Sequence, residues 1–369
     1  MKTEDTFKIV SCFATEGEVT DIRPWGNGLI NDTYKVTTKE PDAPDYVLQR
    51  INTTVFPNVD MLMDNIAAVT RHIRKKLEAA HTTDIDRKVL RFLPTTEGKL
   101  YHREPDGTVW RLMVFIPNAK TYEAVTPEYS YHAGHAFGHF EDMLVDIPEK
   151  LGEVIPNFHN MEFRMEQLRE VIAKNPVDRV KEEKVQQLLA LIDKDGEEMC
   201  KAERMYREGK LPKRVCHCDT KVNNMMFDED GHVLCVIDLD TVMPSFVFSD
   251  YGDFLRSAAN KTAEDDPDMS HVAFNEEIFK AFTRGYLEGA TFLTPVEIEN
   301  LPYAVALFPF MQSVRFLWDY LSGDHYWKCK YPEHNLDRAR NQMRLYQCVR
   351  EHDDMMKQFI AECLKKENV

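Results

Sequence analysis

The sequence has no apolar run long enough to span a bilayer, and its first ten residues lack the apolar core of a signal peptide. It also has no excess of basic residues: 46 Lys and Arg stand against 62 Asp and Glu, for a formal net charge of −16. Nucleic acids and anionic membrane surfaces bind proteins through positively charged surfaces, so neither is expected as a partner of this acidic chain. We expect a cytoplasmic protein, and the sequence leaves its oligomeric state open.

Cysteine frameworks, repeats and low-complexity tracts are absent as well. The eight cysteines are scattered without regular spacing, so reduced thiols are expected. Cys216 and Cys218 flank His217, but alternate side chains of a strand point to opposite faces. Because no second cysteine pair has zinc spacing, we interpret both as buried thiols. A chain of 369 residues that is 43% hydrophobic is expected to form two domains or one bilobal domain.

What the sequence does contain is a segment from Val215 to Asp253 in which aspartates and asparagines alternate with short apolar runs. Within it, the apolar runs Met225–Phe227 and Val233–Ile237 are separated by an Asp-Gly step, which predicts a β-hairpin. In an antiparallel hairpin, the residue that enters the first strand lies beside the residue that leaves the second. Asn224 and Asp238 hold those positions, and their oxygens are suited to Mg²⁺.

Five residues before Asn224 lies Asp219, on the loop that leads into the hairpin. A carboxylate there can orient or deprotonate a hydroxyl group beside the metal. The spacing His217-x-Asp219-x₄-Asn224 is that of a kinase catalytic loop, and Asp238 falls where the metal-binding Asp of a kinase follows. Single carboxylates near turns often only cap them, but this conjunction in fixed order favours phosphoryl transfer.

The strings H-C-D-T-K-V-N-N and V-I-D-L-D resemble the aminoglycoside phosphotransferase and choline kinase superfamily, which uses H-x-D-x₄-N and I-D-[FLW]-[DE]. The longer pattern, continuing through T-V-M-P to D-Y-G-D-F-L-R, resembles the N-acetylhexosamine 1-kinases. That family phosphorylates the anomeric hydroxyl of N-acetylglucosamine or N-acetylgalactosamine. The resemblance runs from about Gly26 to Lys328. It implies Asp219 as the catalytic residue and Asn224 and Asp238 as the Mg²⁺ ligands.

The amino-terminal region is expected to bind the nucleotide. The resembled family forms its nucleotide loop with G-x-G-x-I-N-x-T, and Gly26, Gly28, Asn31 and Thr33 match it. Glycines there let the backbone approach phosphate oxygens. From the residues alone, the glycine pair could equally be a plain hairpin turn.

Arg50 ends the strand predicted at 46–51, where kinases carry a basic residue for the phosphates. We assign it to ATP, although a surface arginine would give the same pattern. The helix predicted over 56–80 supplies Asp64 as the carboxylate that orients Arg50. Asp60 is the rival for that role, and either acid could simply face solvent.

Further short strands are predicted at 89–94, 98–103 and 108–117, and a hinge at 114–117. Beyond it the pattern predicts helices over 132–145, 163–173, 180–206, 276–287 and 295–320, and one or two helices over 335–365. The loop at 155–160 interrupts them. The block Ser249–Phe254 resembles the D-x-G-D segment that braces the catalytic loop, and Arg256 is expected to pair with one of its acids.

Substrate recognition is assigned to the large lobe. The resemblance places I-P-x-F-H and R-F-L-x-D-Y-L-x-G-D-x-Y near the sugar, with Trp327 where the family often has tyrosine. Arg315 and Asp319 are four residues apart and share a helix face, so a surface ion pair is the alternative. A Phe-His pair in a loop could also serve only packing. The substrate-binding candidates are Phe158, His159, His217, Asp240, Arg315, Asp319 and Tyr320.

These patterns predict an α+β protein with the two-lobed, protein-kinase-like fold: a nucleotide-binding lobe over 1–117, with a small antiparallel sheet, and a mainly helical catalytic and sugar-binding lobe over 118–369. The cofactors are ATP and Mg²⁺, and the reaction is phosphorylation of an N-acetylhexosamine at C1. One alternative is a kinase of the same fold acting on another sugar or an amino alcohol. Another is an inactive nucleotide-binding scaffold, which the intact Asp219, Asn224 and Asp238 disfavour.

Overall fold

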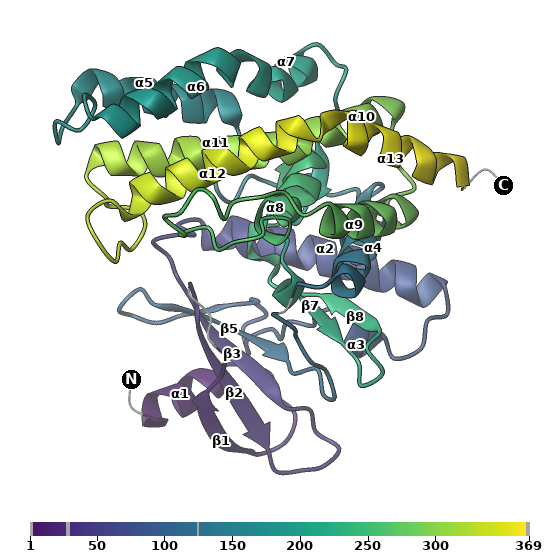
Figure 1. Ribbon diagram of the computed structural model, residues 1–369. Coiled ribbons are helices and arrows are strands. Elements are labelled where there is room, and N and C mark those ends of the chain that lie inside the picture. Colours follow the sequence, from purple (N-terminus) through teal and green to yellow (C-terminus); the bar gives the residue numbers. More distant parts are fainter. Residues whose placement is uncertain (1–2, 27–29, 124, 367–369) are drawn as a thin grey trace. The chain divides into compact units, whose positions relative to one another are not determined.

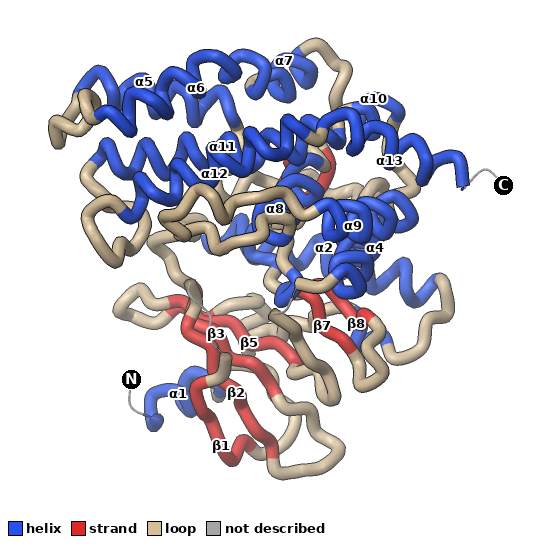
Figure 2. The backbone as a smooth tube through the Cα atoms, viewed as in Figure 1, coloured by secondary structure: helices blue, strands red, loops and turns tan. Residues whose placement is uncertain are grey.

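The computed structural model describes residues 3–26, 30–123 and 125–366, which form two compact units (Figures 1 and 2). The sheet unit comprises Met1–Thr121, Asp146–Pro156 and Met225–Met243. The helical unit comprises Tyr122–Val145, Asn157–Asn224 and Pro244–Val369. The predicted α+β class is confirmed, with an antiparallel sheet in the amino-terminal region and helices in the carboxy-terminal region.

A five-stranded sheet of order β1-β2-β3-β5-β4 dominates the sheet unit, and every pairing in it is antiparallel. Its strands are β1 (Val19–Pro24), β2 (Asp32–Thr38), β3 (Tyr46–Ile51), β4 (His102–Arg103) and β5 (Val109–Val114). The prediction for 46–51 is confirmed. The strand predicted at 89–94 is wrong, because only Phe92 forms a bridge, to Met113. Pro94 has no N–H to continue that pairing.

One face of this sheet carries the apolar core of the unit. Tyr46, Leu48, Trp110 and Leu112 are buried there with side chains of α1 (Thr3–Val10). Because strand side chains alternate between faces, the residues between these positions, including Gln49 and Arg111, belong to the opposite face.

The sheet unit also contains α2 (Val59–Ala79) and α3 (Ile85–Lys88). Asn58 caps α2 by accepting a hydrogen bond from the Met61 N–H, and a stripe of apolar residues at helical spacing is buried. The helix predicted over 56–80 is therefore confirmed. The single turn of α3 was not predicted.

The predicted hairpin is confirmed as β7 (Met225–Phe227) and β8 (Val233–Val236), in the sheet unit. Gly231 takes a φ of +86° in the turn, a conformation that favours glycine. Phe227 also exchanges two backbone hydrogen bonds with Lys120, of 2.8 and 2.9 Å. The hairpin is thereby tied to the chain segment that follows β5.

Among the described residues, the regular elements of the helical unit are almost all helices. The exceptions are the short strand β6 (Arg214–Cys216) and most of β9 (Met243–Ser245), whose first residue belongs to the sheet unit. Single 3₁₀ turns lie at η1 (Val222–Asn224), in the helical unit, and at η2 (Leu239–Thr241), in the sheet unit. The helices of the helical unit are α4 (Pro127–Leu144), α5 (Met161–Lys174), α6 (Glu183–Met199), α7 (Lys201–Arg207), α8 (Phe248–Ala258), α9 (Glu276–Gly289), α10 (Pro295–Glu299), α11 (Leu301–Ser322), α12 (His334–Glu351) and α13 (Asp353–Lys366).

Two predicted long helices are each divided in the structure. The stretch predicted over 180–206 breaks at Cys200 into α6 and α7, and the stretch over 295–320 breaks at Asn300 into α10 and α11. Pro302 lies in the first turn of α11, where its missing N–H costs nothing, so a new helix starts there readily.

Helices α4 and α9 pack with their backbones in contact, as their adjacent ribbons in Figure 1 indicate. A Cβ added at Gly134 of α4 would lie 2.1 Å from the Phe282 carbonyl oxygen, and one at Gly285 of α9 would lie 2.1 Å from the Tyr131 carbonyl oxygen. Glycine at these positions allows an approach that any side chain would prevent.

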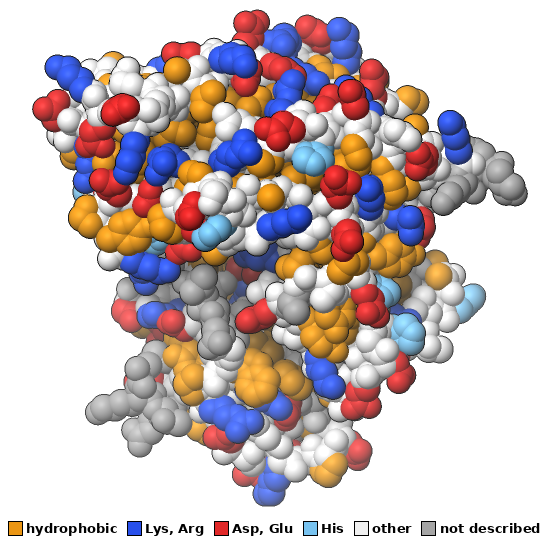
Figure 3. Space-filling model, in the orientation of Figure 1, with side chains coloured by type: hydrophobic (Ala, Val, Ile, Leu, Met, Phe, Trp, Pro, Cys, Tyr) orange, Lys and Arg blue, Asp and Glu red, His pale blue; other side chains and the backbone are white. Residues whose placement is uncertain are grey.

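The molecular surface is mixed in charge on the face drawn in Figure 3, where acidic and basic side chains are interspersed over the helical elements. All eight cysteines are free thiols, and Cys216 and Cys218 are buried, as predicted. Among the described residues, no helix has the length and apolarity that crossing a bilayer requires.

Candidate active site

The loop between β6 and η1 is held by one buried carboxylate of α8. Asp250 accepts hydrogen bonds from the backbone N–H groups of His217 and Cys218, both 2.7 Å long. Its carbonyl oxygen accepts a third from the Thr220 hydroxyl, at 2.8 Å. Cys218 has a φ of +64°, a strained conformation that such clamping can maintain. The D-x-G-D block therefore fixes the backbone of the loop that carries Asp219.

Burial raises the pKa of Asp250 to about 6, although His217 and the two backbone N–H donors act in the opposite direction. Above that pH the carboxylate is ionised and can accept both backbone hydrogen bonds at full strength.

His217 is fully buried inside this loop. Its ring makes edge contacts with Phe137 and Phe140, at centroid distances of 5.4 and 6.0 Å, and its Nδ1 accepts the Asp219 N–H at 3.3 Å. These contacts orient the loop backbone. Its predicted role in substrate binding stays a prediction.

Asp219 lies at the centre of the loop's polar side chains. Lys221 Nζ lies 2.8 Å from its Oδ2, and Asn224 Nδ2 donates to its backbone oxygen at 2.8 Å. A carboxylate beside an ammonium group can orient a hydroxyl and accept its proton, while the lysine offsets negative charge. Lys221 was not singled out from the sequence.

Asn224 and Asp238 offer oxygen donors of the kind that Mg²⁺ prefers. The Asn224 side chain is buried, and the hydrogen bond from its Nδ2 fixes the amide so that Oδ1 is the atom offered to a cation. Asp238 follows β8 in the sheet unit and has a left-handed backbone, with φ 60° and ψ 57°. The donor chemistry of both residues fits a divalent magnesium ion.

Asp240, two residues further on, is buried and bound at both oxygens within the sheet unit. Arg111 Nη1 lies 2.5 Å from Oδ1, and Asn31 Nδ2 donates to Oδ2 at 2.7 Å. The structure thus brings together Asn31, predicted for ATP, and Asp240, predicted for substrate. Both predictions remain untested.

The nucleotide-loop candidates differ in their surroundings. Gly26 has a φ of +74° with open space where a Cβ would stand, and Gly28 lies outside the described residues. Thr33 Oγ1 accepts from Gln49 Nε2 at 3.1 Å. A glycine at position 26 therefore meets a backbone requirement, and its role in nucleotide binding stays a prediction.

Arg50 forms an ion pair with Asp32 at 2.5 Å, and both side chains are about half exposed. It belongs to the face of the sheet opposite Gln49 and Arg111. Asp64 is exposed on α2, and its rival Asp60 accepts a hydrogen bond from the Tyr101 hydroxyl at 2.5 Å. The structure brings neither acid to Arg50 in any described hydrogen bond or ion pair, and the phosphate role of Arg50 stays a prediction.

Three substrate candidates lie together in the helical unit. Phe158 stacks on His159 at 4.3 Å, and the Arg315 guanidinium lies 5.5 Å from the Phe158 ring and 5.3 Å from the Trp327 ring. Burial lowers the pKa of His159 to about 3, so the ring is neutral, and its buried Nδ1 has no hydrogen-bond partner among the described residues. Arg315 hydrogen bonds to Gln312 at 3.0 Å rather than to Asp319. This aromatic cluster offers a few polar groups beside ring faces, as small-molecule sites do.

Asp319 and Tyr320 instead contact the segment that follows α11. The Asp319 carboxylate is fully buried and accepts from the backbone N–H groups of His325, Tyr326 and Trp327, at 2.9 to 3.1 Å, and from Asn335 Nδ2 at 2.8 Å.

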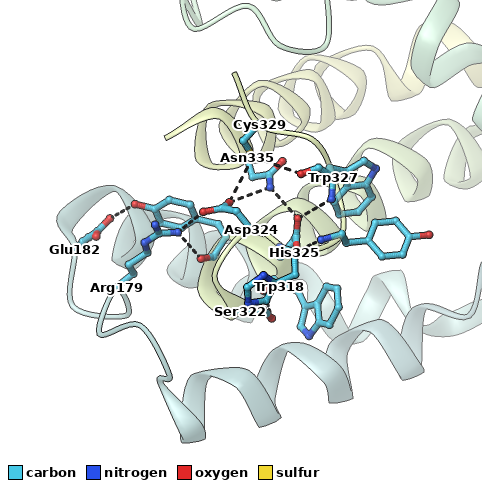
Figure 4. Close-up of polar contacts among 12 residues, drawn as sticks. Arg179, Glu182, Trp318, Ser322, Asp324, His325, Trp327, Cys329 and Asn335 are labelled. Atoms are coloured by element: carbon cyan, nitrogen blue, oxygen red, sulfur yellow. Dashed lines mark hydrogen bonds and ion pairs between the residues drawn. The ribbon is translucent and has the colours of Figure 1, made fainter. Parts of the chain in front are cut away.

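Asn335 also donates to Asp324 at 3.0 Å, and Asp324 pairs with Arg179 at 2.5 Å (Figure 4). Tyr320 donates to Glu182 at 2.8 Å. These contacts fix the turn that carries Trp327, so Asp319 can shape the aromatic cluster without touching a ligand.

One buried acid behind the loop was missed entirely. Glu141 of α4 is 2% exposed, its Oε2 accepts from the Tyr286 hydroxyl, and its Oε1 has no partner among the described residues. One of its carboxyl oxygens lies within 4.8 Å of the Cys216 thiol sulfur and of a carboxyl oxygen of Asp250. Burial, and next the charge of Asp250, raise the pKa of Glu141 well above its usual range, which favours the neutral form of this carboxyl.

The family model of the phosphotransferase enzyme family (APH) matches this chain over residues 21–291, which is more than half of its length. The chain belongs to this family. An aminoglycoside phosphotransferase from Alicyclobacillus acidocaldarius shares its fold with a TM-score of 0.63 and 15% identity, over 96% of each chain.

Two further solved kinases are similar to this phosphotransferase. The amicoumacin kinase hAmiN, in complex with AMP-PNP, Ca²⁺ and Ami, has a TM-score of 0.56 at 14% identity, over 96% of this chain and 94% of that one. A choline kinase from Cryptosporidium parvum has a TM-score of 0.57 at 14% identity, over 97% and 99%. Family and fold together make the chain a kinase-like phosphotransferase.

Proposed function

We propose that this phosphotransferase transfers the γ-phosphoryl group of ATP to the C1 hydroxyl of N-acetylglucosamine or N-acetylgalactosamine, in the cytoplasm. The observation that carries the proposal is the catalytic loop, in which Asp219 lies beside Lys221 and Asn224 on a backbone clamped by Asp250. The family match supports phosphoryl transfer, and the motif resemblance supports the amino sugar.

In this reaction a bond forms between the sugar C1 oxygen and Pγ, and the bond from Pγ to the bridging oxygen of ADP breaks. Asp219 orients the hydroxyl and accepts its proton, and the lysine ammonium beside it offsets charge on the transferred group. Asn224 Oδ1 and the Asp238 carboxylate are the proposed ligands of Mg²⁺. When bound, the ion neutralises charge on the phosphate oxygens. Arg50, Gly26, Gly28, Asn31 and Thr33 remain proposed nucleotide contacts.

The aromatic cluster of Phe158, His159, Arg315 and Trp327 is the proposed acceptor subsite. Ring faces pack on the C–H surface of a sugar, and the guanidinium can donate to its hydroxyl or acetamido oxygens. Burial, and next the charge of Arg315, lower the pKa of Arg164 to about 9. Two neighbouring arginines disfavour a cationic amino alcohol in this subsite, which favours the sugar over the alternative acceptors.

The test is ADP release with a panel of free sugars and amino alcohols, followed by ³¹P and ¹H NMR of the product. A phosphorus signal coupled to the anomeric proton supports the proposal. A 6-phosphate product, or turnover only with another alcohol, would refute the substrate and leave the fold and family intact. If no acceptor of the panel is phosphorylated, the result would favour an inactive scaffold.

In the same assay, Arg315→Ala should raise the KM for the sugar much more than the KM for ATP. Arg207→Ala removes an exposed arginine that pairs with Glu162 and is the matched control. Equal effects on both KM values would exclude Arg315 from the acceptor subsite.

A further inference from the structure

The sheet unit carries an unassigned cation on the face opposite its apolar core. Thr33, Gln49 and Arg111 are cross-strand partners on β2, β3 and β5, so their side chains share one face. On this face β3 carries the neutral Gln49 between the other two residues. The positive charge comes from the neighbouring strand, on Arg111.

Arg111 is 2% exposed and fully engaged. Its Nη1 pairs with Asp240 Oδ1 at 2.5 Å, and its Nε and Nη2 donate to Gln49 Oε1 at 3.0 and 2.8 Å. Asn31 completes the arrangement, because its Nδ2 donates to Asp240 and its Oδ1 accepts from the Asn52 N–H at 3.0 Å. A buried ion pair with this geometry holds its acidic partner in one place.

A second attachment lies two residues beyond Asp240. Asn65 of α2 is buried, and its Nδ2 donates to the Val242 carbonyl oxygen at 2.9 Å and to the Gly152 carbonyl oxygen at 2.8 Å. Its Oδ1 accepts from the Gly152 N–H at 3.1 Å. The short segment 240–242 is therefore fixed by a side chain at one end and through its backbone at the other.

Immediately before this fixed segment, Asp238 has the left-handed backbone described above. A non-glycine residue keeps such a conformation only where its surroundings enforce it. The backbone angles of Asp238 decide where its carboxylate points. Whatever holds residues 240–242 thus controls the direction of the proposed metal ligand.

We propose that Arg111 is a positioning residue for Asp238: its ion pair with Asp240, together with Asn31 and Asn65, holds the Asp238 backbone in the conformation that presents the carboxylate to a divalent cation. This inference rests on the proposed function only in taking Asp238 as a metal ligand. It does not depend on the acceptor.

The test uses Mn²⁺ as the probe, with AMP-PNP and the full chain. Arg111→Met should weaken Mn²⁺ binding about 10- to 100-fold, as loss of partners that orient metal ligands commonly does. Electron paramagnetic resonance measures the free Mn²⁺. Hydrogen exchange of the amides at 238–242 should accelerate in the same variant.

Two controls separate positioning from general destabilisation. Leu112→Ala removes a fully buried side chain from the other face of β5 and should lower Tm without changing Mn²⁺ affinity more than twofold. In the double variant Arg111→Met, Asp240→Leu, no buried charge is left unpaired, so Tm should recover. Mn²⁺ binding in that variant should stay weak.

Parent-like Mn²⁺ affinity in Arg111→Met would overturn the proposal. So would an equal loss of affinity in Leu112→Ala at the same fall in Tm, or recovery of affinity in the double variant. If the parent binds Mn²⁺ and the Arg111 variants behave as expected, yet no amino sugar is phosphorylated, the proposed substrate fails and the positioning role stands.

Discussion

At the residue scale, the proposed reaction depends most directly on Asp219. Replacement by Asn keeps the side-chain shape but removes the charge that pairs with Lys221. Asp219→Asn should lower kcat by roughly 10²- to 10⁴-fold while ATP binding is retained, because general-base and orienting contributions have that size. Steady-state kinetics and calorimetric titration with AMP-PNP measure both quantities. Unchanged turnover would remove Asp219 from the mechanism.

Glu141 gives the protein a pH-dependent stability. Its pKa is raised above the ordinary 4.5, so the unfolded chain releases this proton at a lower pH than the folded chain does. Stability therefore falls as the pH rises above about 4.5, by up to about 1.4 kcal/mol per pH unit, until the raised folded pKa is passed. Glu141→Gln cannot ionise, so the variant should gain stability relative to the parent as the pH rises.

Urea unfolding of parent and variant from pH 5 to pH 9 measures this difference. Glu128→Gln, an exposed position in the first turn of the same helix, is the control and should show no such trend. A pH-independent difference between Glu141→Gln and the parent would show that Glu141 is already ionised in the folded protein.

Sequence reasoning found the residues whose roles are set locally. The Asp-Gly turn, the spacing from His217 to Asn224 and the D-x-G-D block all lie within one stretch, and the hairpin and the loop clamp follow from it. The pair of Arg111 and Asp240 spans 129 positions of sequence and could not be found in this way. Long-range contacts of this kind leave no periodicity or spacing in a single sequence.

At the element scale, α4 and α9 depend on glycine. Gly134→Ala places a Cβ against the backbone of Phe282, which cannot yield as a flexible side chain can. We expect a loss of stability of about 1 to 3 kcal/mol from overpacking. Gly196→Ala on α6 meets only the end of the Met165 side chain and should be neutral or stabilising, since alanine favours helix by about 1 kcal/mol.

Chemical denaturation of the two glycine variants provides the comparison. A Gly134→Ala variant as stable as the parent would mean that the two helices can separate without cost. Helical periodicity in the sequence predicted α4 and α9. It could not predict that their backbones are in contact, because that depends on which faces of the two helices meet.

At the scale of the whole molecule, ligand binding should raise the free energy of unfolding. A ligand that binds only the folded state at 100 times its Kd stabilises it by about 2.7 kcal/mol. AMP-PNP with Mg²⁺ should raise the Tm of the parent more than AMP-PNP with chelator. In Asp238→Ala this Mg²⁺-dependent increment should vanish, whereas Glu229→Ala, an exposed acid of the hairpin turn, should retain it. An equal increment in both variants would refute the metal assignment.

The fold class was predictable because residues 1–117 contain the strand patterns and most later residues contain helical ones. The structural units do not follow that simple division, since the sheet unit also takes Asp146–Pro156 and the hairpin segment Met225–Met243. A sequence shows where elements begin and end, but the assembly of distant segments depends on contacts such as those between Lys120 and Phe227. The assignment of nucleotide binding to 1–117 stays a prediction.

That discontinuity has a consequence for biosynthesis. The segment Met1–Thr121 leaves the ribosome without the β7–β8 hairpin, whose last residues belong to a part of the chain made much later. At about 5–20 residues per second, the interval from Thr121 to Met243 is about 6 to 24 s. Until then Lys120 has no Phe227 to bond with, and the nascent sheet is incomplete. Although Met1–Thr121 is synthesised first, we therefore expect it to need protection by chaperones until the hairpin segment has been made.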